Sequence, residues 1–536
     1  MDSISVLERL RLEYRPTRPA MLERPSGVEE LGATTAQADS VAIEQAFPSL
    51  YGAPRVEFRG DPAEDAGESR AIRVGVVLSG GQAPGGHNVI AGLFDALQEL
   101  HSGSELIGFL GGPKGIFESD HRLLSAERID AHRNTGGFDL IGSGRDKISS
   151  EEHIRASREC CDRLGLDGLV IIGGDDSNTN AATLAEAFAQ GGSETSVVGV
   201  PKTIDGDLKG GGIEASFGFD TATKVYSELI GNIQRDARSA KKYWHFIKLM
   251  GRSASHVTLE CALRTRPNVA LIGEEIRHRD WTLRKLVEHL ADVVRQRAEQ
   301  GRHYGVCLVP EGLIEFIPEI GRLIDALNDL LAAGVQDREA LMEKLSPESA
   351  NAFRSLPASI QEQLLLDRDS HGNVQVSRID TQALLAEAVA DELGDSVKFS
   401  TQQHFFGYEG RCAAPSNFDA NYTYALGMAA ARLIAHRRSG YIASVGNLVA
   451  PTPEWTAGGI PLTSLMQMEQ RKGKPTPVIA KALVDLHDAP FETFAARRAS
   501  WLLEDAYRYP GPIQYFGPTE LTDRPTHTLQ LESEER

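Results

Sequence analysis

The stretch Ile72–Asn88, IRVGVVLSGGQAPGGHN, begins as a short apolar run rich in β-branched residues and ends as a glycine-rich loop. Helical-looking segments separate it from five more apolar runs along the chain, DGLVII (167–172), SVVGV (196–200), WHFIKLM (244–250), NVALIG (268–273) and YGVCLV (304–309). This alternation predicts a doubly wound α/β fold whose mostly parallel sheets are buried on both faces. Because 536 residues exceed one ordinary hydrophobic core, we expect two lobes of this kind.

Changes in composition along the chain predict how these lobes are divided. Short helical patterns mixed with proline, glycine and acidic residues precede the first strand and indicate an N-terminal extension. Leucine-rich amphipathic stretches beyond the sixth run indicate a helical insertion. We expect an extension at 1–70, a first lobe at 71–238 completed by about 435–490, a second lobe at 239–434 with its insertion at about 314–393, and a C-terminal tail at 491–536.

The composition also limits the partners. A net charge of −19 argues against nucleic acid and anionic membranes, because like charges repel at long range. Residues 1–51 carry Glu, Asp and Arg throughout and contain no apolar run long enough for a signal peptide or a membrane span. Five cysteines without a CxxC pair are typical of a reduced chain. We therefore expect a cytoplasmic protein that binds neither nucleic acid nor membrane.

The loop SGGQAPGGHN (79–88) has the composition of a phosphate site. Its four glycines allow backbone N–H groups to face an anion, and a helix expected from near Asn88 adds partial positive charge at its N-terminus. The loop matches neither GxGxxG nor GxxxxGK[ST], the two common nucleotide fingerprints. The alternative is a tight turn between a strand and a helix.

A second loop, GGDDSNTNA (173–181), places two adjacent carboxylates at a strand end. A carboxylate at a phosphate site repels the substrate unless a hard cation intervenes, and oxygen ligands favour Mg²⁺. Asp175 is our candidate metal ligand. The alternative is that Ser177 or Asn178 caps a helix beginning near Thr179.

A third loop, PKTIDGDLK (201–209), combines two aspartates with two lysines. Lys202 and Lys209 offer positive charge to phosphoryl oxygens, and Asp205 or Asp207 offers a carboxylate that can take a proton from an attacking hydroxyl. Phosphoryl transfer needs both functions. The alternative is a solvated charged turn, which we disfavour because the loop follows the apolar run SVVGV.

Three later motifs add charged groups after apolar runs. KKYWHFIKLMGRSASH (241–256) carries two lysines before a strand and Arg252 after it, PEG (310–312) carries a carboxylate, and YEGR (408–411) carries a guanidinium. Taken singly, Lys241 and Lys242 are as expected of surface charges. Together the motifs provide the groups needed to bind a sugar phosphate.

Seven motifs, taken in order between Ile72 and Arg411, closely resemble the phosphofructokinase family: SGGQAPGGHN, GGDDSNTNA, PKTIDGDLK, KKY, MGRSASH, PEG and YEGR. The length, the extension and the helical insertion are similar to those of the family's long, pyrophosphate-dependent group. The resemblance implies a phosphofructokinase-like fold and a magnesium-dependent phosphotransferase. Its implied substrates are pyrophosphate and fructose 6-phosphate, and its implied products are orthophosphate and fructose 1,6-bisphosphate, formed reversibly in glycolysis or gluconeogenesis.

The resemblance also implies roles for single residues. Gly81 matches a glycine at the donor phosphates, and Asp175 matches the aspartate associated with Mg²⁺. Asp205 matches the base that activates the 1-hydroxyl of the sugar, with Thr203 and Ile204 beside the substrate.

Further matches concern the sugar and a second subunit. Lys242 and Tyr243 match a segment contributed across a subunit interface, which implies a homodimer with a shared active site. The matched sugar-phosphate pocket consists of Met250, Gly251, Arg252, Glu311, Tyr408, Glu409, Gly410 and Arg411.

Two residues indicate which donor is used. The ATP-using branch of the family carries glycine where Asp176 stands, so the bulk and charge of this aspartate are expected to exclude the α-phosphate of ATP. Lys202 stands where that branch carries a small or hydroxyl residue, and it can neutralise a leaving phosphate.

The alternatives to this function are an ATP-dependent enzyme and a non-catalytic regulatory subunit. A dinucleotide oxidoreductase is disfavoured because GxGxxG is missing after the first strand, and sedoheptulose 7-phosphate stays open as a further acceptor.

Overall fold

The computed structural model describes residues 6–23, 27–60, 70–335, 337–366, 374, 378–471, 474–511 and 523–534. The chain forms two compact units. Unit 1 comprises 1–222, 410–482 and 514–525, and unit 2 comprises 223–409, 483–513 and 526–536. The boundaries therefore fall inside helices α8 (Phe219–Ala240) and α18 (Tyr408–Arg411). The boundaries expected near 238 and 434 stay predictions, and residues 61–69 and 512–522, in the expected extension and tail, lie outside the described residues.

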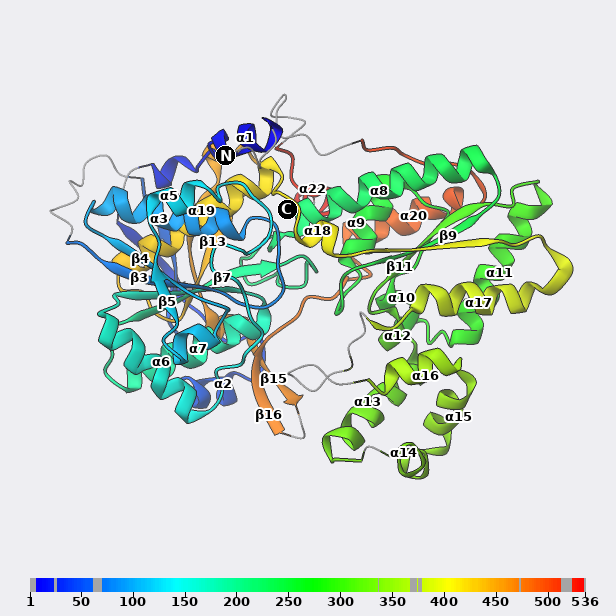
Figure 1. The fold of residues 1–536 in the computed structure, drawn as a ribbon, viewed down its shortest axis with the longest axis horizontal. Helices are drawn as coiled ribbons and strands as arrows, with labels where there is room; N and C mark the ends of the chain where they lie inside the picture. Colours follow the sequence, from blue (N-terminus) through cyan, green and yellow to red (C-terminus); the bar gives the residue numbers. More distant parts are fainter. Residues whose placement is uncertain are drawn as a thin grey trace. The chain divides into compact units, whose positions relative to one another are not determined.

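Unit 1 is built on a ten-stranded sheet with the order β1-β2-β14-β13-β7-β6-β3-β4-β5, in which β8 also pairs with β7 (Figure 1). The strands from β13 to β4 are parallel, and the pairs at the two ends of the sheet are antiparallel. The strands are β1 (Val28–Ala33), β2 (Pro54–Phe58), β3 (Arg73–Leu78), β4 (Glu105–Phe109), β5 (His121–Leu123), β6 (Gly168–Gly173), β7 (Ser196–Thr203), β8 (Phe217–Gly218), β13 (Tyr441–Gly446) and β14 (Thr456–Pro461).

Helices cover both faces of this sheet, as a doubly wound fold requires. Helices α3 and α19 pack together on one face, and α6 and α7 lie on the other (Figure 1). In β6, Leu169 belongs to the core beneath α6 and α7, whereas its neighbour Gly168 lies against Ile434 of α19. The helices of unit 1 are α1 (Val6–Glu13), α2 (Ser40–Ala46), α3 (Gly86–Leu100), α4 (Lys114–Phe117), α5 (Ala126–Asp130), α6 (Glu151–Leu164), α7 (Asp175–Gln190) and α19 (Asn417–Ala435).

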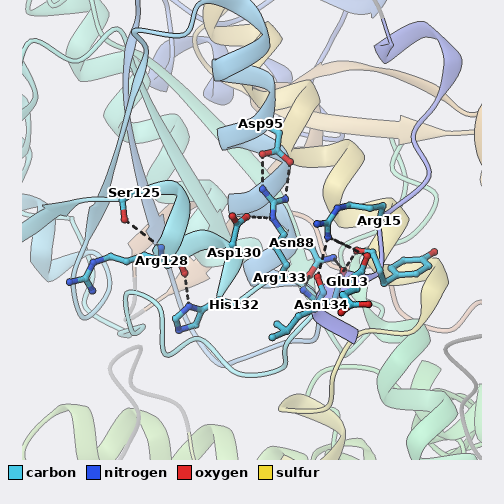
Figure 2. A network of polar contacts seen from close by, with 12 residues as sticks. Glu13, Arg15, Asn88, Asp95, Ser125, Arg128, Asp130, His132, Arg133 and Asn134 are labelled. Atoms are coloured by element: carbon cyan, nitrogen blue, oxygen red, sulfur yellow. Dashed lines mark hydrogen bonds and ion pairs between the residues drawn. The ribbon is translucent and has the colours of Figure 1, made fainter. Parts of the chain in front are cut away.

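A polar network ties the N-terminal extension to unit 1 (Figure 2). Arg133 forms two hydrogen bonds of 2.8 Å with the carboxylate of Asp95 in α3 and a third, of 2.6 Å, with Asp130. The next residue, Asn134, donates its side-chain amide to the carbonyl oxygens of Arg11 and Tyr14, each at 2.8 Å. These bonds satisfy carbonyl groups at the end of α1 and so hold the extension on the outside of the sheet.

Unit 2 contains a four-stranded, fully parallel sheet with the order β10-β11-β9-β12. Its strands are β9 (Trp244–Leu249), β10 (Val269–Ala270), β11 (Gly305–Pro310) and β12 (Thr401–Phe406), and its covering helices are α9 (His256–Thr265), α10 (Gly273–His278), α11 (Leu283–Glu299), α20 (Ala489–Leu503) and α22 (His527–Glu534). Every residue of β9 and β11 is buried, whereas β12 lies at an edge and exposes several polar side chains.

The segment between β11 and β12 is helical, with α12 (Leu313–Phe316), α13 (Pro318–Ala332), α14 (Arg338–Lys344), α15 (Pro347–Ser355), α16 (Ala358–Leu364) and α17 (Thr381–Leu393). Its buried leucines share one core with β9 and β11. Lys248 in β9, only 1% exposed, donates to the carbonyl oxygen of Ile379 at 2.9 Å and lies 3.8 Å from the Asp380 carboxylate. A buried ammonium therefore links the strand to the residues that precede α17.

The doubly wound α/β fold expected from the sequence is confirmed. The six apolar runs form β3, β6, β7, β9, β10 and β11, although β10 keeps only two residues of its run. Helix α3 begins at Gly86, slightly earlier than expected. Among the residues that the structure describes, no helix is long and apolar enough to cross a membrane.

Candidate active site

The glycine-rich loop after β3 lies close to cationic side chains of unit 1. Lys202 donates to the carbonyl oxygen of Gly81 at 2.8 Å, and Arg411 donates to that of Gln82 at 3.0 Å. A Cβ atom on Gly81 would lie 2.9 Å from a guanidinium nitrogen of Arg411 and 3.4 Å from one of Arg145. The absence of a side chain at Gly81 therefore leaves space for the two guanidinium groups beside the loop that precedes α3.

The acidic loop after β6 forms the first turn of α7, because the helix begins at Asp175 with Gly174 as its N-cap. Capping by Ser177 or Asn178, the alternative considered above, is wrong because both residues lie inside the helix. Ser177 instead donates to the Ser79 hydroxyl at 2.8 Å, and Asn178 donates to the Gly173 carbonyl at 2.6 Å. The Ser177 bond joins the two loops, the Asn178 bond ties the start of α7 to the end of β6, and the helix N-terminus stabilises the adjacent carboxylates.

The two carboxylates of this turn have different cationic partners. Asp175 lies 3.5 Å from the Lys481 ammonium, and Asp176 lies 2.5 Å from the Arg471 guanidinium. Arg471 ends β15 (Met466–Arg471), which forms an antiparallel hairpin with β16 (Lys474–Ile479), and Lys481 follows that hairpin. Arg471, which lies 295 positions after Asp176 in the sequence, and Lys481 thus supply the cationic partners of the two carboxylates in this loop.

Strand β7 continues to Thr203, so the first residues of the PKTIDGDLK motif belong to the strand, and the buried Lys202 near its end lies among carboxylates of the loop that follows. Burial, followed by the charge of Arg411, lowers the pKa of Lys202 to about 7, and Asp205 and Asp175 oppose this shift. Burial, together with the charges of Asp205 and Asp175, raises the pKa of Asp207 to about 7. Arg411 lies 3.7 Å from the Asp205 carboxylate. The cluster can therefore change its charge near neutral pH.

The turn that carries Asp205 is fixed by local contacts. The Thr203 hydroxyl accepts the Asp205 backbone N–H at 3.0 Å, and Gly206 has a φ of +75°, which other residues rarely adopt. The Ile204 side chain is fully buried, so it anchors the turn and leaves its backbone to the site. The Asp205 carboxylate is held 7% exposed at the end of a strand in the middle of the sheet.

In unit 2, the MGR and PEG motifs meet at the ends of β9 and β11. The Gly251 backbone N–H donates to the Glu311 carboxylate at 2.8 Å, and Gly251 has a φ of +142°. A Cβ atom on Gly312 would lie 1.9 Å from the Arg252 carbonyl oxygen, so the two loops touch through their backbones. Glu311 is only 1% exposed.

The structure assigns the sequence-predicted residues to the two units as follows. Unit 1 brings together the donor-side residues and the end of the YEGR motif, Gly81, Asp175, Asp176, Lys202, Thr203, Ile204, Asp205, Gly410 and Arg411. Unit 2 contains Lys242, Tyr243, Met250, Gly251, Arg252, Glu311, Tyr408 and Glu409. Lys242 and Tyr408 are exposed, Tyr408 at 65%.

Three cations near the donor-side residues were missed by the sequence analysis. Arg145 follows the glycine-containing stretch IGSG, a signal that could have marked it. Arg471 and Lys481 carry no such signal, because an exposed hairpin rich in polar residues resembles any surface segment.

Asp175 has the chemistry of a magnesium ligand. Its Oδ2 atom is buried and makes no hydrogen bond, and its ion pair with Lys481 is long. Mg²⁺ needs only one or two carboxylates when substrate phosphates and water complete its shell. Across the described ranges, no group of three or more His, Cys, Asp or Glu residues is arranged to hold a metal. A single carboxylate that shares the ion with a phosphate donor fits this arrangement.

A family model described as phosphofructokinase matches residues 73–434, which include all of these motifs. The chain belongs to the phosphofructokinase family. Its curated relatives include the pyrophosphate–fructose 6-phosphate 1-phosphotransferase of Treponema pallidum, which is 55% identical over 99% of this chain and 97% of that protein. The protein of the same description from Porphyromonas gingivalis is 52% identical over 99% of this chain and 100% of its own length.

Two further comparisons extend the family relationship. The beta subunit of pyrophosphate–fructose 6-phosphate 1-phosphotransferase from Solanum tuberosum is 51% identical over 98% of this chain and 94% of that subunit. The crystal structure of pyrophosphate-dependent phosphofructokinase from Nitrosospira multiformis aligns with a TM-score of 0.55, covering 82% of this chain and 93% of that one. Its sequence identity is 16%, so this likeness concerns the phosphofructokinase fold.

Proposed function

We propose that this phosphofructokinase transfers a phosphoryl group from pyrophosphate to the 1-hydroxyl of fructose 6-phosphate, reversibly, giving fructose 1,6-bisphosphate and orthophosphate. The observation that carries the proposal is the presence of two residues on the donor side of unit 1, Asp176 in the first turn of α7 and Lys202, whose ammonium donates to Gly81 of the phosphate loop. The near-full-length identity to proteins named for this reaction supports it.

The proposed mechanism assigns each group of unit 1 one task. Lys202, which contacts the phosphate loop, attracts the negative charge of the donor and of the leaving orthophosphate. Asp205 accepts the proton of the sugar hydroxyl as that oxygen attacks the phosphorus in line. Asp175 would hold Mg²⁺, which supplies positive charge to the phosphate oxygens when bound. Gly81 and the helix N-terminus offer backbone N–H groups to the same phosphates.

For the sugar phosphate, we propose Arg252 and Arg411 as the cations that bind the acceptor. Glu311 accepts the Gly251 N–H and so fixes the loop from which Arg252 projects. Thr203 and Ile204 hold the turn of Asp205. We also propose Met250, Tyr408 and Glu409 of unit 2 and Gly410 of unit 1 as residues that bind the acceptor.

A homodimer in the cytoplasm is the proposed assembly and location. The exposure of Lys242 leaves it available to a second chain, and Tyr243 follows it directly. Sedimentation equilibrium should give twice the chain mass, and Lys242→Ala should raise KM for fructose 6-phosphate. A fully active monomer would contradict the shared site.

One assay of the chain expressed alone addresses two alternative functions. An ATP-dependent enzyme is disfavoured by Asp176, and a non-catalytic subunit is disfavoured because Asp175, Lys202, Asp205 and Arg252 are all present. The chain expressed alone should be tested with pyrophosphate and ATP as donors, with fructose 6-phosphate and sedoheptulose 7-phosphate as acceptors, with and without Mg²⁺. Turnover with pyrophosphate, fructose 6-phosphate and Mg²⁺ is expected. Turnover with ATP alone would refute the donor assignment, and an inactive chain would refute the catalytic one.

A further inference from the structure

The β15–β16 hairpin supplies a cation to Asp176 that no sequence motif indicates. Arg471 Nη1 lies 2.5 Å from Asp176 Oδ1, and Arg471 Nε donates to Glu469 at 2.8 Å. The side chains of Arg471 and Asp176 are 23% and 28% exposed, so the pair is largely withdrawn from solvent. The guanidinium of Arg471 therefore bonds two carboxylates at once, those of Asp176 and Glu469, and these bonds fix the geometry of the pair.

The hairpin is attached to the same helix that carries Asp176. The Ile479 backbone N–H donates to the Thr179 hydroxyl of α7 at 3.1 Å, one turn beyond Asp176. At the same end of the hairpin, where Met466 pairs with Ile479, the Met466 carbonyl accepts the Ala38 N–H at 3.3 Å, and Met466 itself is fully buried. Arg471 is thus presented from a strand that is anchored at its base.

We propose that Arg471 is a specificity-determining residue for the phosphoryl donor, which acts by fixing and neutralising the carboxylate of Asp176. The inference rests on the role proposed for Asp176 in excluding ATP. An unpaired Asp176 would repel pyrophosphate as well as ATP, because both donors are anions. Paired with Arg471, it occupies the space that an α-phosphate needs, while the guanidinium offsets the charge of its carboxylate beside the smaller donor.

Asp175 and Asp176 have different partners, and this difference supports the role proposed for Arg471. Asp175 faces the cluster of Asp205, Asp207 and Lys481, as the effect of its charge on Asp207 indicates. Asp176 instead faces the hairpin. One carboxylate therefore stays available for a cation shared with substrate, and the other is committed to a protein cation.

The test compares four variants, Arg471→Ala, Arg471→Lys, Asp176→Gly and the double variant R471A/D176G. Arg438→Ala is the matched control, because Arg438 is 28% exposed in the same unit and forms an ion pair of 2.8 Å with Glu30. Because one charge-assisted hydrogen bond is lost, R471A should raise KM for pyrophosphate about tenfold with kcat changed less than about threefold. R471K should restore most of this loss, and R438A should match the parent protein.

A binding measurement separates a donor effect from a general structural one. Isothermal titration of the full chain with magnesium pyrophosphate, without sugar, should show the same roughly tenfold loss of affinity in R471A. In the D176G background, R471A should have no further effect on either donor, because the guanidinium acts through the carboxylate. D176G alone should lower pyrophosphate use and permit weak ATP use.

The possible outcomes are distinct. Equal losses from R471A in both backgrounds would mean that Arg471 contacts the donor itself, and a match between R471A and R438A would mean that it has no donor role. Either result overturns the inference and leaves the proposed function intact. Unchanged donor use in D176G would overturn the role of Asp176 and the inference together, whereas a chain without pyrophosphate activity would refute the proposed function.

Discussion

Replacing Gly92 with alanine should separate the helix that carries the phosphate loop from the helix packed beside it. Helices α3 and α19 cross with a glycine on each side, Gly92 and Gly427. A Cβ atom on Gly92 would lie 2.1 Å from the Tyr424 carbonyl oxygen, and one on Gly427 would lie 2.1 Å from that of Val89. Since ordinary contacts begin near about 3.5 Å, the backbones would have to part by more than about 1 Å.

The cost follows from two opposing terms. Overpacking of this kind costs about 1–3 kcal/mol, and the upper end applies here because the obstructing atoms are backbone. The better helix propensity of alanine offsets about 1 kcal/mol, so we expect a net loss near 2 kcal/mol. Because α3 begins at the phosphate loop, a shift of this size should also lower kcat/KM for pyrophosphate by about 10- to 100-fold.

Thermal denaturation and steady-state kinetics would measure both effects. Gly231→Ala in α8 is a suitable control, because its Cβ atom would lie 3.2 Å from the Pro510 Cδ atom, a much smaller overlap than the one at Gly92. The control should change stability by less than about 1 kcal/mol and leave the kinetics unchanged. If Gly92→Ala behaved like this control in both assays, the backbone contact would not position the loop.

Three other predictions address single groups. Asp205→Asn should lower kcat at least about 100-fold while KM for fructose 6-phosphate stays within about threefold, and a near-normal kcat would exclude the role of general base. Since the pKa of Lys202 is about 7 and only its protonated form attracts an anion, kcat/KM for pyrophosphate should fall as pH rises through 7. Lys202→Met should remove this dependence, and an unchanged profile would assign it to another group. Burial lowers the folded-state pKa of Lys248, so the unfolded chain binds more protons and Lys248 makes stability rise with pH toward 10.5. Lys248→Met should flatten the dependence of Tm on pH over that range, and an identical slope in both proteins would show that the ammonium is not withdrawn from water.

The sequence predicted the parts of the fold that depend on continuous burial. Strands β6 and β11 are buried along their whole length, and this requires the apolar runs from which they were predicted. Strand β12, TQQHFF, lacks such a run because it lies at the edge of its sheet, where several of its side chains are exposed to solvent and can be polar. Its pairing with β9 depends on tertiary context that local patterns do not contain.

In the candidate site, too, some positions follow from the local sequence and others depend on tertiary packing. Asp175 and Asp205 follow parallel strands and Lys202 lies near the end of one, and the ends of such strands meet at one edge of a sheet, so their proximity could be predicted. Arg471 comes from a hairpin nearly 300 residues away, and nothing in its neighbours indicates where it will pack. The helix start was misplaced because a glycine N-cap gives no side-chain signal.

The order of strands in the sheet of unit 1 has a consequence for synthesis of the chain. Strand β7 lies between β6 and β13, but β13 follows it by about 240 residues, and most of unit 2 is made in the interval. At about 5–20 residues per second, the nascent β7 waits roughly 10–50 s for this neighbour. During that time an apolar strand presents unpaired N–H and C=O groups on one side, which favours association with other chains. Recovery of correctly folded protein should therefore depend on ribosome speed and on the chaperones that reach this edge first.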